Sequence, residues 1–173
     1  MNSLIIYSST DGQTKKICEA IINNSEYKNS FEILSLEEAF KIKLENYNRI
    51  IIGASIRYGR HSPMLYEFIE RNKKFLQNSK SAFFSVNVVA RKIEKNTPNT
   101  NPYIKKFFKK TSWRPDKLGV FAGKIDYPNL TFINRNIIRL IMFLTKGPTN
   151  TKKIYEFTDW QEVKRFSKDL DKL

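Results

Sequence analysis

The sequence has little cysteine and histidine and no long apolar segment. It contains one cysteine and one histidine among 173 residues. A single cysteine excludes an internal disulfide, and without a cluster of His and Cys we expect no zinc or other metal site. No run approaches the roughly 20 apolar residues that span a bilayer, and no charged head precedes an apolar segment at the N-terminus. We therefore expect no signal peptide, a reducing cytoplasm, and a core position for Cys18.

Acidic residues are also scarce, and the deficit is concentrated in one part of the chain. The net charge is +14, and residues 91–153 hold fifteen Lys and Arg against three Asp and Glu, which is +12 of that total. The positive electrostatic field of such a segment indicates an anionic partner, which can be nucleic acid, an acidic protein or an anionic membrane leaflet. A solvated basic surface is the alternative. The basic residues are not interleaved with stacking aromatics, so we expect no nucleic-acid partner.

Residues 4–14 predict a strand, a tight turn and the start of a helix. Leu4, Ile5 and Ile6 are an apolar, β-favouring run, and helical spacing begins at Ile17. The first N–H groups of such a helix have no internal partner and carry the positive end of the helix dipole, so an anion can bind there. The turn adds hydroxyl donors and a glycine that allows close approach. The predicted ligand is a phosphate.

The turn lacks the features of the two common nucleotide loops. It has one glycine and no lysine before Thr14, which excludes a Walker loop and a three-glycine dinucleotide loop. A cradle of hydroxyls and amides suits a single phosphate monoester, and the pattern at residues 9–14 resembles the FMN-phosphate loop of flavodoxins. Asp11 departs from that pattern, and we expect its carboxylate to turn outward or to cap the helix. An ordinary capped helix is the alternative interpretation.

Further segments predict a doubly wound α/β fold. We expect strands at residues 31–34, 49–54, 82–87 and 118–122, with the fifth strand resumed at 154–157. Ser62 and Pro63 predict the start of a helix, as do Thr158 or Asp159 near the end of the chain. The expected architecture is a single flavodoxin-like domain over residues 1–173, with a five-stranded parallel sheet and a long insertion in the fifth strand at about 124–153.

Three loops are expected to meet at the carboxyl edge of this sheet, where such folds bind ligands. The second loop offers Tyr58 to stack on a ring and Gly59 for close approach, although Tyr58 taken alone is more typical of a surface or core aromatic than of a flavin partner. The third loop, residues 87–92, offers amides and Arg91. The predicted binding residues are Ser9, Thr10, Asp11, Gly12, Gln13 and Thr14 in the first loop, Ser55, Ile56, Arg57, Tyr58 and Gly59 in the second, and Ser85, Asn87, Val88, Val89, Ala90 and Arg91 at the third.

Residues 131–145, within the insertion, predict an amphipathic helix. Ile133, Ile137, Leu140, Ile141 and Leu144 share one face, and we expect Arg135, Arg139 and Lys146 on the opposite side. The helix is too short to span a bilayer and is patterned to lie on an anionic membrane surface. Packing of its apolar face on the sheet is the alternative.

Taken together, the chain resembles the flavodoxin-like, quinone-dependent protoporphyrinogen oxidases of bacterial haem synthesis. The resemblance is carried by residues 9–14, 53–59, 85–92, 113–116 and 155–160 and covers nearly the whole chain. It implies an FMN enzyme that carries out the six-electron oxidation of protoporphyrinogen IX, passes the electrons to menaquinone or ubiquinone, and lies peripherally on the cytoplasmic face of the inner membrane.

The same resemblance implies cationic partners for the two propionates of the substrate. The candidates by loop position are Arg57, Arg60, Arg91, Lys92 and Arg114. His61 is either a proton acceptor near the flavin or a solvent-exposed loop residue, and no catalytic residue is identified. Two other flavoproteins fit the loops, an electron-transfer flavodoxin and an FMN-dependent NAD(P)H:quinone reductase. The basic charge argues against the flavodoxin, because flavodoxins are usually acidic.

Overall fold

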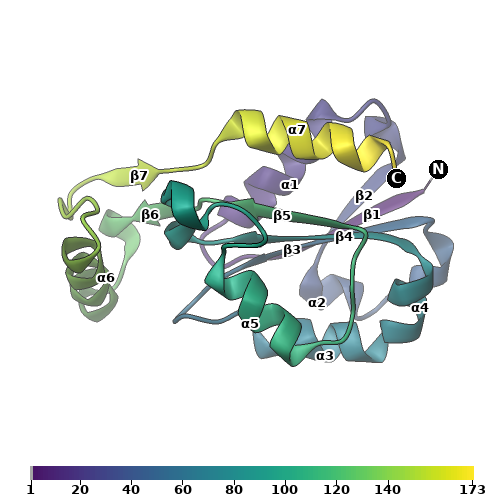
Figure 1. Ribbon diagram of the computed structural model, residues 1–173, viewed down its shortest axis with the longest axis horizontal. Coiled ribbons are helices and arrows are strands. Elements are labelled where there is room, and N and C mark those ends of the chain that lie inside the picture. The colour runs from purple at the N-terminus through teal and green to yellow at the C-terminus, as the bar shows by residue number, and fades with distance from the viewer. Residues whose placement is uncertain (1) are drawn as a thin grey trace.

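The computed structural model describes residues 2–173 and shows a parallel sheet covered by helices on both faces (Figure 1). The strands are β1 (Ser3–Ser8), β2 (Phe31–Ser35), β3 (Arg49–Ser55), β4 (Lys80–Val86) and β5 (Lys117–Phe121). They are parallel throughout, in the order β2-β1-β3-β4-β5. This confirms the predicted doubly wound sheet, and the strand order reverses between β1 and β3.

The core consists of two layers because the central strands are buried on both faces. Successive side chains of β1 alternate between them: Leu4 and Ile6 pack in one cluster, while Ile5 packs in the other. Ile51 of β3 belongs to the same cluster as Ile5. The continuous apolar runs of the sequence are therefore explained by helices on both sides of the sheet.

Helices α1 (Gln13–Asn24) and α7 (Trp160–Asp171) cover one face of the sheet (Figure 1). The other face carries α2 (Leu36–Ala39), α3 (Pro63–Arg71), α4 (Lys73–Asn78) and α5 (Pro102–Lys110). Pro63 is the first residue of α3, as predicted, but the Ser62 side chain makes no capping hydrogen bond within residues 2–173. Asp159 caps α7 by accepting from the N–H groups of Gln161 and Glu162. Helix α5 was not predicted.

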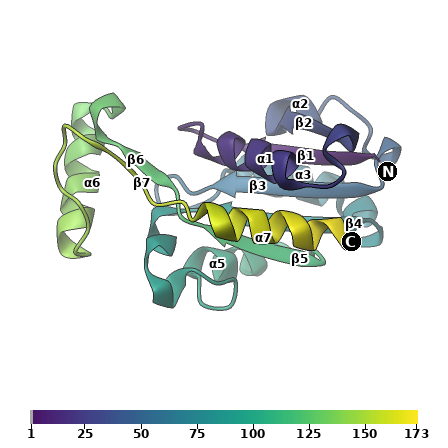
Figure 2. The same ribbon diagram turned by 90° about the horizontal axis from the view of Figure 1, so that it is seen from above.

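The insertion forms a separate unit beyond the end of β5. Strands β6 (Lys124–Asp126) and β7 (Ile154–Glu156) pair antiparallel and carry α6 (Phe132–Leu144) between them (Figure 2). The expectation that residues 154–157 resume the fifth strand is wrong, since β7 pairs with β6 and lies outside the five-stranded sheet. Within residues 2–173, no helix combines the length and apolar character that crossing a membrane requires.

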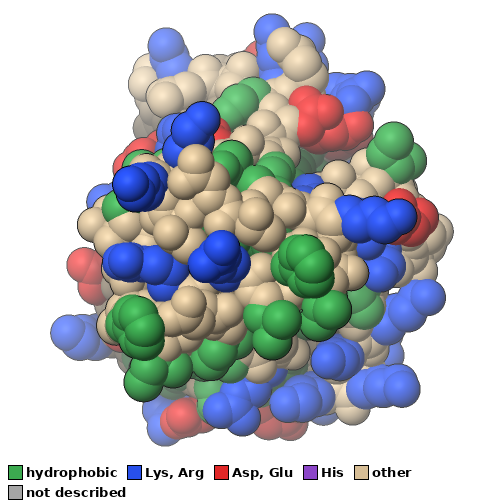
Figure 3. Space-filling view, turned by 90° about the vertical axis from the view of Figure 1, so that its left-hand side faces the viewer, with side chains coloured by type: hydrophobic (Ala, Val, Ile, Leu, Met, Phe, Trp, Pro, Cys, Tyr) green, Lys and Arg blue, Asp and Glu red, His purple; other side chains and the backbone are tan. Residues whose placement is uncertain are grey.

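Most of the apolar face of α6 points away from the body of the protein, whereas Ile137 and Ile141 at its edge line a cavity beneath the helix. Phe132 is 78% exposed and Leu144 71% exposed, whereas Met142 on the opposite side is buried. Figure 3 looks onto this end of the molecule, where hydrophobic side chains form a band among lysines and arginines. Packing of this face on the sheet, the alternative considered from the sequence, is therefore excluded for the single chain.

Arg135 of α6 corrects the predicted basic stripe. Its guanidinium donates to the backbone carbonyl oxygens of Tyr127, Pro128 and Leu130 at 3.0–3.1 Å, and thereby holds the turn that precedes the helix. The side opposite the apolar face therefore packs toward the protein, and only Arg139 and Lys146 of the three predicted cations are exposed.

Candidate functional site

The loops that follow β1, β3 and β4 meet at the carboxyl edge of the sheet. A cavity of about 50 Å³ lies against the first loop, and one of about 350 Å³ lies beside it, enclosed on the outside by α6. Asp11, Ile56, Asn87 and Val88 line both cavities, so the two adjoin. The predicted convergence of three loops is observed.

The first loop carries two buried hydroxyl oxygens that lack a protein partner. Ser9 Oγ and Thr14 Oγ1 are buried and have no hydrogen bond to any described residue. Because burying an unpaired hydroxyl costs about 1–3 kcal/mol, these two atoms indicate a ligand that accepts hydrogen bonds. Gly12 precedes α1 with φ 77°, a conformation that favours glycine. In the described chain no side chain caps the N–H groups that begin α1.

Asp11 turns outward, which is one of the two orientations expected for it. Its carboxylate forms an ion pair with Arg57 of the second loop, 3.2 Å from Oδ2 to Nη1. The guanidinium of Arg57 lies 5.2 Å from the centre of the Tyr58 ring. Tyr58 is 74% exposed and adopts φ 50°, a strained conformation for a residue with a side chain. The second loop is thus fixed to the first and presents an aromatic ring at the cavity.

The third loop is held by a buried amide network. Asn87 Oδ1 accepts from Ala90 N–H at 3.0 Å and from Asn101 Nδ2 at 3.2 Å, and Asn87 Nδ2 donates to Ser85 Oγ. Ser85 is fully buried, so its hydroxyl contacts this network rather than the cavity. The loop therefore offers its backbone and the side chains of Val88 and Val89 to the larger cavity.

Most of the predicted binding residues line the two cavities, and four do not. Thr10, Gly12, Ser85 and Ala90 are absent from both linings. The residues that do line a cavity are Ser9, Asp11, Gln13, Thr14, Ser55, Ile56, Arg57, Tyr58, Gly59, Asn87, Val88, Val89 and Arg91. The side-chain amide of Gln13 is engaged with Thr158 Oγ1 at 2.9 Å.

Sequence reasoning missed the residues that later segments bring to the larger cavity. Tyr103 comes from α5, Lys124 from β6, and Ile138 from α6. Helix α5 has a local signal, because Asn101 caps it and Pro102 occupies its first position. Lys124 and Ile138 have no such signal, since only the path of the insertion places them at the cavity.

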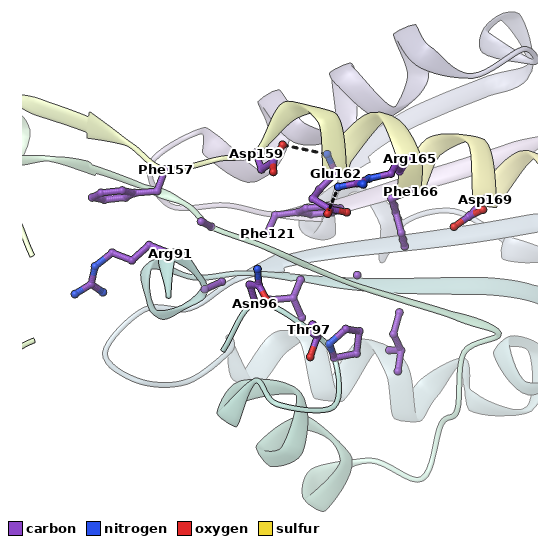
Figure 4. A pocket seen from close by; sticks show the side chains of 16 residues that line it. Arg91, Asn96, Thr97, Phe121, Phe157, Asp159, Glu162, Arg165, Phe166 and Asp169 are labelled. Atoms are coloured by element: carbon purple, nitrogen blue, oxygen red, sulfur yellow. Dashed lines mark hydrogen bonds and ion pairs between the residues drawn. The ribbon is translucent and has the colours of Figure 1, made fainter. Parts of the chain in front are cut away.

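A third hollow, of about 630 Å³, runs along β5 and beneath α7, and Arg91 lines both it and the 350 Å³ cavity (Figure 4). It contains no residue of the first two loops. Asp159, Glu162 and Asp169 line it, and Glu162 is paired with Arg165 (Figure 4). These carboxylates disfavour an anionic ligand, so the hollow is a poor candidate for the predicted phosphate.

His61 is buried, which corrects the alternative that placed it in solvent. It is 2% exposed, with Nε2 3.0 Å from Ser85 Oγ and Nδ1 3.4 Å from the Tyr66 hydroxyl. Burial, together with the charge of Lys110, lowers the pKa of His61 to about 4. The imidazole is therefore neutral at pH 7 and a weak base, and it packs edge-on against both Phe83 and Phe107.

Acidification is expected to destabilise the protein through His61. Between its folded pKa of about 4 and its ordinary value of 6.5, the unfolded chain binds a proton that the folded chain does not. The stability gained from neutral His61 is complete above pH 6.5 and is lost as the pH falls toward 4, by about 2 kcal/mol at pH 5. Urea unfolding of the wild type and of His61→Gln at pH 7.5 and 5 measures the difference. A folded-state imidazole pKa at or above 6.5 by NMR would contradict this assignment.

Two of the arginines proposed as carboxylate partners already donate hydrogen bonds within the protein. Arg91 donates to Val88 O at 3.2 Å and to Thr145 Oγ1 at 2.7 Å, which ties the third loop to the end of α6. Arg114 donates to Thr111 O and Trp113 O and lies over the Phe108 ring. Arg114 lines neither of these cavities.

Comparison with known proteins agrees with this geometry. The family model described as flavodoxin domain matches residues 4–152. Protoporphyrinogen IX dehydrogenase [quinone] of Escherichia coli strain K12 is 39% identical over 171 residues, which is 98% of this chain and 94% of that protein. The chain belongs to this flavodoxin-domain family of dehydrogenases. A protein of the same name from Leishmania major is 40% identical over 169 residues, covering 96% of this chain and 73% of that protein.

Solved flavodoxins share the fold at low sequence identity. A flavodoxin from the domain Archaea has a TM-score of 0.54 at 20% identity and covers 99% of this chain and 97% of its own. Flavodoxin 2 from Bacillus cereus has a TM-score of 0.58 at 14% identity and covers 99% of both chains. At these identities the likeness shows the flavodoxin-like fold alone.

Proposed function

We infer that this chain is a quinone-dependent protoporphyrinogen IX dehydrogenase. It oxidises protoporphyrinogen IX to protoporphyrin IX by removing six electrons and six protons, and it reduces three molecules of menaquinone or ubiquinone to the quinol. The observation that carries this inference is the 39% identity to the Escherichia coli dehydrogenase across nearly the whole of both chains. Matching lengths mean that the insertion is included in the likeness.

The first loop fits the phosphate of FMN. Within residues 2–173, Ser9 Oγ and Thr14 Oγ1 are buried donors without hydrogen-bond partners, and they lie where the N–H groups that begin α1 lack a side-chain cap. No lysine or metal is needed for one monoester. FMN, when bound, supplies the two-electron redox chemistry. We assign Ser9, Thr14 and the N–H groups at the start of α1 to the phosphate, and the second and third loops to the ring.

The remaining residues of the site position the ligands and exclude water. Tyr58 can cover one side of a ring in the 350 Å³ cavity, since it is exposed at the mouth and its hydroxyl is 3.4 Å from Asn134 of α6. Ile138 and Met142 close the cavity from α6 with apolar side chains. An apolar enclosure suits both a reduced tetrapyrrole and the head of a lipid quinone.

We also propose that α6 attaches the enzyme peripherally to an anionic membrane surface. Its outward face is apolar, and Arg139 and Lys146 are exposed beside that face. An interfacial helix of this kind gains from apolar burial and from attraction between lysine or arginine and anionic lipid. A quinone held in the bilayer would then reach the cavity from the side of α6.

The decisive experiment is an anaerobic assay of the FMN-loaded protein with protoporphyrinogen IX and menaquinone. Porphyrin fluorescence is expected to rise only when both flavin and quinone are present. Flavin-free protein and a reaction without quinone are the controls. A protein that binds FMN and is reduced by NADPH, yet forms no porphyrin above these controls, would be an NAD(P)H:quinone reductase instead.

A further inference from the structure

A basic cleft of about 320 Å³ lies next to the larger cavity, between α5 and the loop before α3. Arg60 comes from the loop, and Lys106, Lys109 and Lys110 come from α5. The three lysines are spaced three and four residues apart, so they share one face of the helix. Tyr66, Tyr103 and the imidazole of His61 form the aromatic part of its lining.

The four cations of this basic cleft lack acidic partners. All four are exposed, and within residues 2–173 none has a carboxylate oxygen within 4 Å. Two of them lie over the aromatic lining instead: Lys110 Nζ is 5.2 Å from the centre of the Tyr66 ring, and Lys106 Nζ is 5.5 Å from that of Tyr103. Like charges held this close repel one another, so an anion that binds among them relieves the repulsion.

The basic cleft adjoins the cavity assigned to the flavin ring. Gly59 and Tyr103 line both spaces. Gly59 has φ 74°, and within residues 2–173 no atom lies within 4 Å of the position that a side chain would take there, so the space on that side of Gly59 is open. A ligand that lies in the apolar cavity can therefore extend an anionic group past Gly59 into the basic cleft.

We propose that the basic cleft binds the propionate carboxylates of the tetrapyrrole substrate. This inference rests on the proposed function, which makes the substrate an apolar macrocycle with two carboxylates. The macrocycle matches the apolar lining that α6 contributes beside the space assigned to the flavin ring, and the carboxylates match the lysines of α5 through charge-assisted hydrogen bonds. Arg60 belongs to this group, whereas the guanidinium of Arg57 is paired with Asp11 and that of Arg91 with backbone carbonyls.

The proposal predicts that the carboxylates of the ligand strengthen binding only when the lysines of α5 are present. The probes are protoporphyrin IX and its dimethyl ester, whose binding to the FMN-loaded protein is followed by fluorescence. The wild type is expected to bind the dicarboxylate about tenfold more tightly than the ester, and added salt should reduce the difference.

The triple variant Lys106→Gln, Lys109→Gln, Lys110→Gln should bind both probes with similar affinity. Because these side chains are exposed, the variant should keep its FMN and its melting temperature.

A matched triple variant on α7 controls for the change in net charge. Lys164→Gln, Lys168→Gln, Lys172→Gln removes the same three charges from exposed positions and should preserve the preference for the dicarboxylate. If the α5 variant keeps the preference, or if it loses only binding to anionic vesicles, the inference is overturned. Binding of neither probe to the wild type would overturn it as well.

Failure of this inference is distinct from failure of the proposed function. Turnover of protoporphyrinogen IX by the wild type tests the function independently of where the carboxylates lie. A wild type that forms porphyrin, yet shows no preference for the dicarboxylate, loses only the assignment of the basic cleft.

Discussion

Replacing Thr14 with valine is expected to weaken FMN binding about 10- to 100-fold, because it removes one hydrogen bond to a charged phosphate. The same change should not destabilise the protein without flavin. Thr14 Oγ1 is buried and has no partner among the described residues, so valine removes a desolvated hydroxyl and keeps the shape of the side chain. Loss of affinity without loss of stability is the result that separates a ligand-binding hydroxyl from a structural one.

Adding Gly12→Leu to Thr14→Val should abolish FMN retention during purification. Gly12 has φ 77°, which leucine adopts only with strain, although an added side chain would meet no atom within 4 Å at its first carbon. The strain would shift the turn that leads into α1. Titration of apoprotein with FMN, followed by quenching of flavin fluorescence, measures both variants.

Thr100→Val is the matched control for these variants, since Thr100 is exposed and its hydroxyl contacts Thr97. It should bind FMN as the wild type does. A purified double variant of Gly12 and Thr14 that still carries stoichiometric flavin would refute the assignment of the first loop. Equal loss of affinity in Thr100→Val would point to a nonspecific effect on folding.

Placing two glutamates on the outward face of α6 is expected to release the protein from anionic vesicles. Leu140 and Leu144 are 58% and 71% exposed, so Leu140→Glu with Leu144→Glu should not disturb the fold. The two changes remove about 3 kcal/mol of apolar burial in the interface and add repulsion from anionic lipid. The partition coefficient, measured by co-sedimentation, should fall about 100-fold or more.

The control for the α6 variant carries the same charge change elsewhere. Tyr27→Glu with Ile93→Glu alters two exposed apolar side chains outside α6 and should leave vesicle binding nearly unchanged. Unchanged co-sedimentation of the α6 variant would exclude this face as the membrane contact. Arg135→Glu is not a suitable probe, because Arg135 holds the turn before α6 through three backbone carbonyls.

Much of the site could be read from local sequence. The run from Leu4 to Ile6 forms β1, the hydroxyl-rich turn follows, and Gly12 adopts the left-handed conformation that only glycine takes easily. The carboxyl ends of parallel strands meet at one edge, so the sequence also places Tyr58 and Asn87 near that turn. Such features depend on residues adjacent in the sequence and on the rule that the carboxyl ends of parallel strands lie at one edge of the sheet.

Other features of the site depend on contacts between residues far apart in the chain. The helical spacing of α6 defines two faces, but it does not say which face packs, and Arg135 lies on the packed side because carbonyls of the preceding turn accept its hydrogen bonds. His61 is buried because Phe83 and Phe107 enclose it. These outcomes depend on tertiary packing, which a single sequence does not encode in any local pattern.

Short-range features of the sequence predicted the sheet, the three loops, the hydroxyl-rich turn and the apolar stripe of α6. Each of these follows from short-range periodicity, turn chemistry or charge. The folded chain was needed to show that β7 pairs with β6, that α6 turns most of its apolar stripe outward, and that the lysines of α5 lie beside Arg60. The reason is physical: strand pairing, burial of a helix face and the meeting of like charges are set by the free energy of the whole packed chain, in which segments distant in sequence become neighbours.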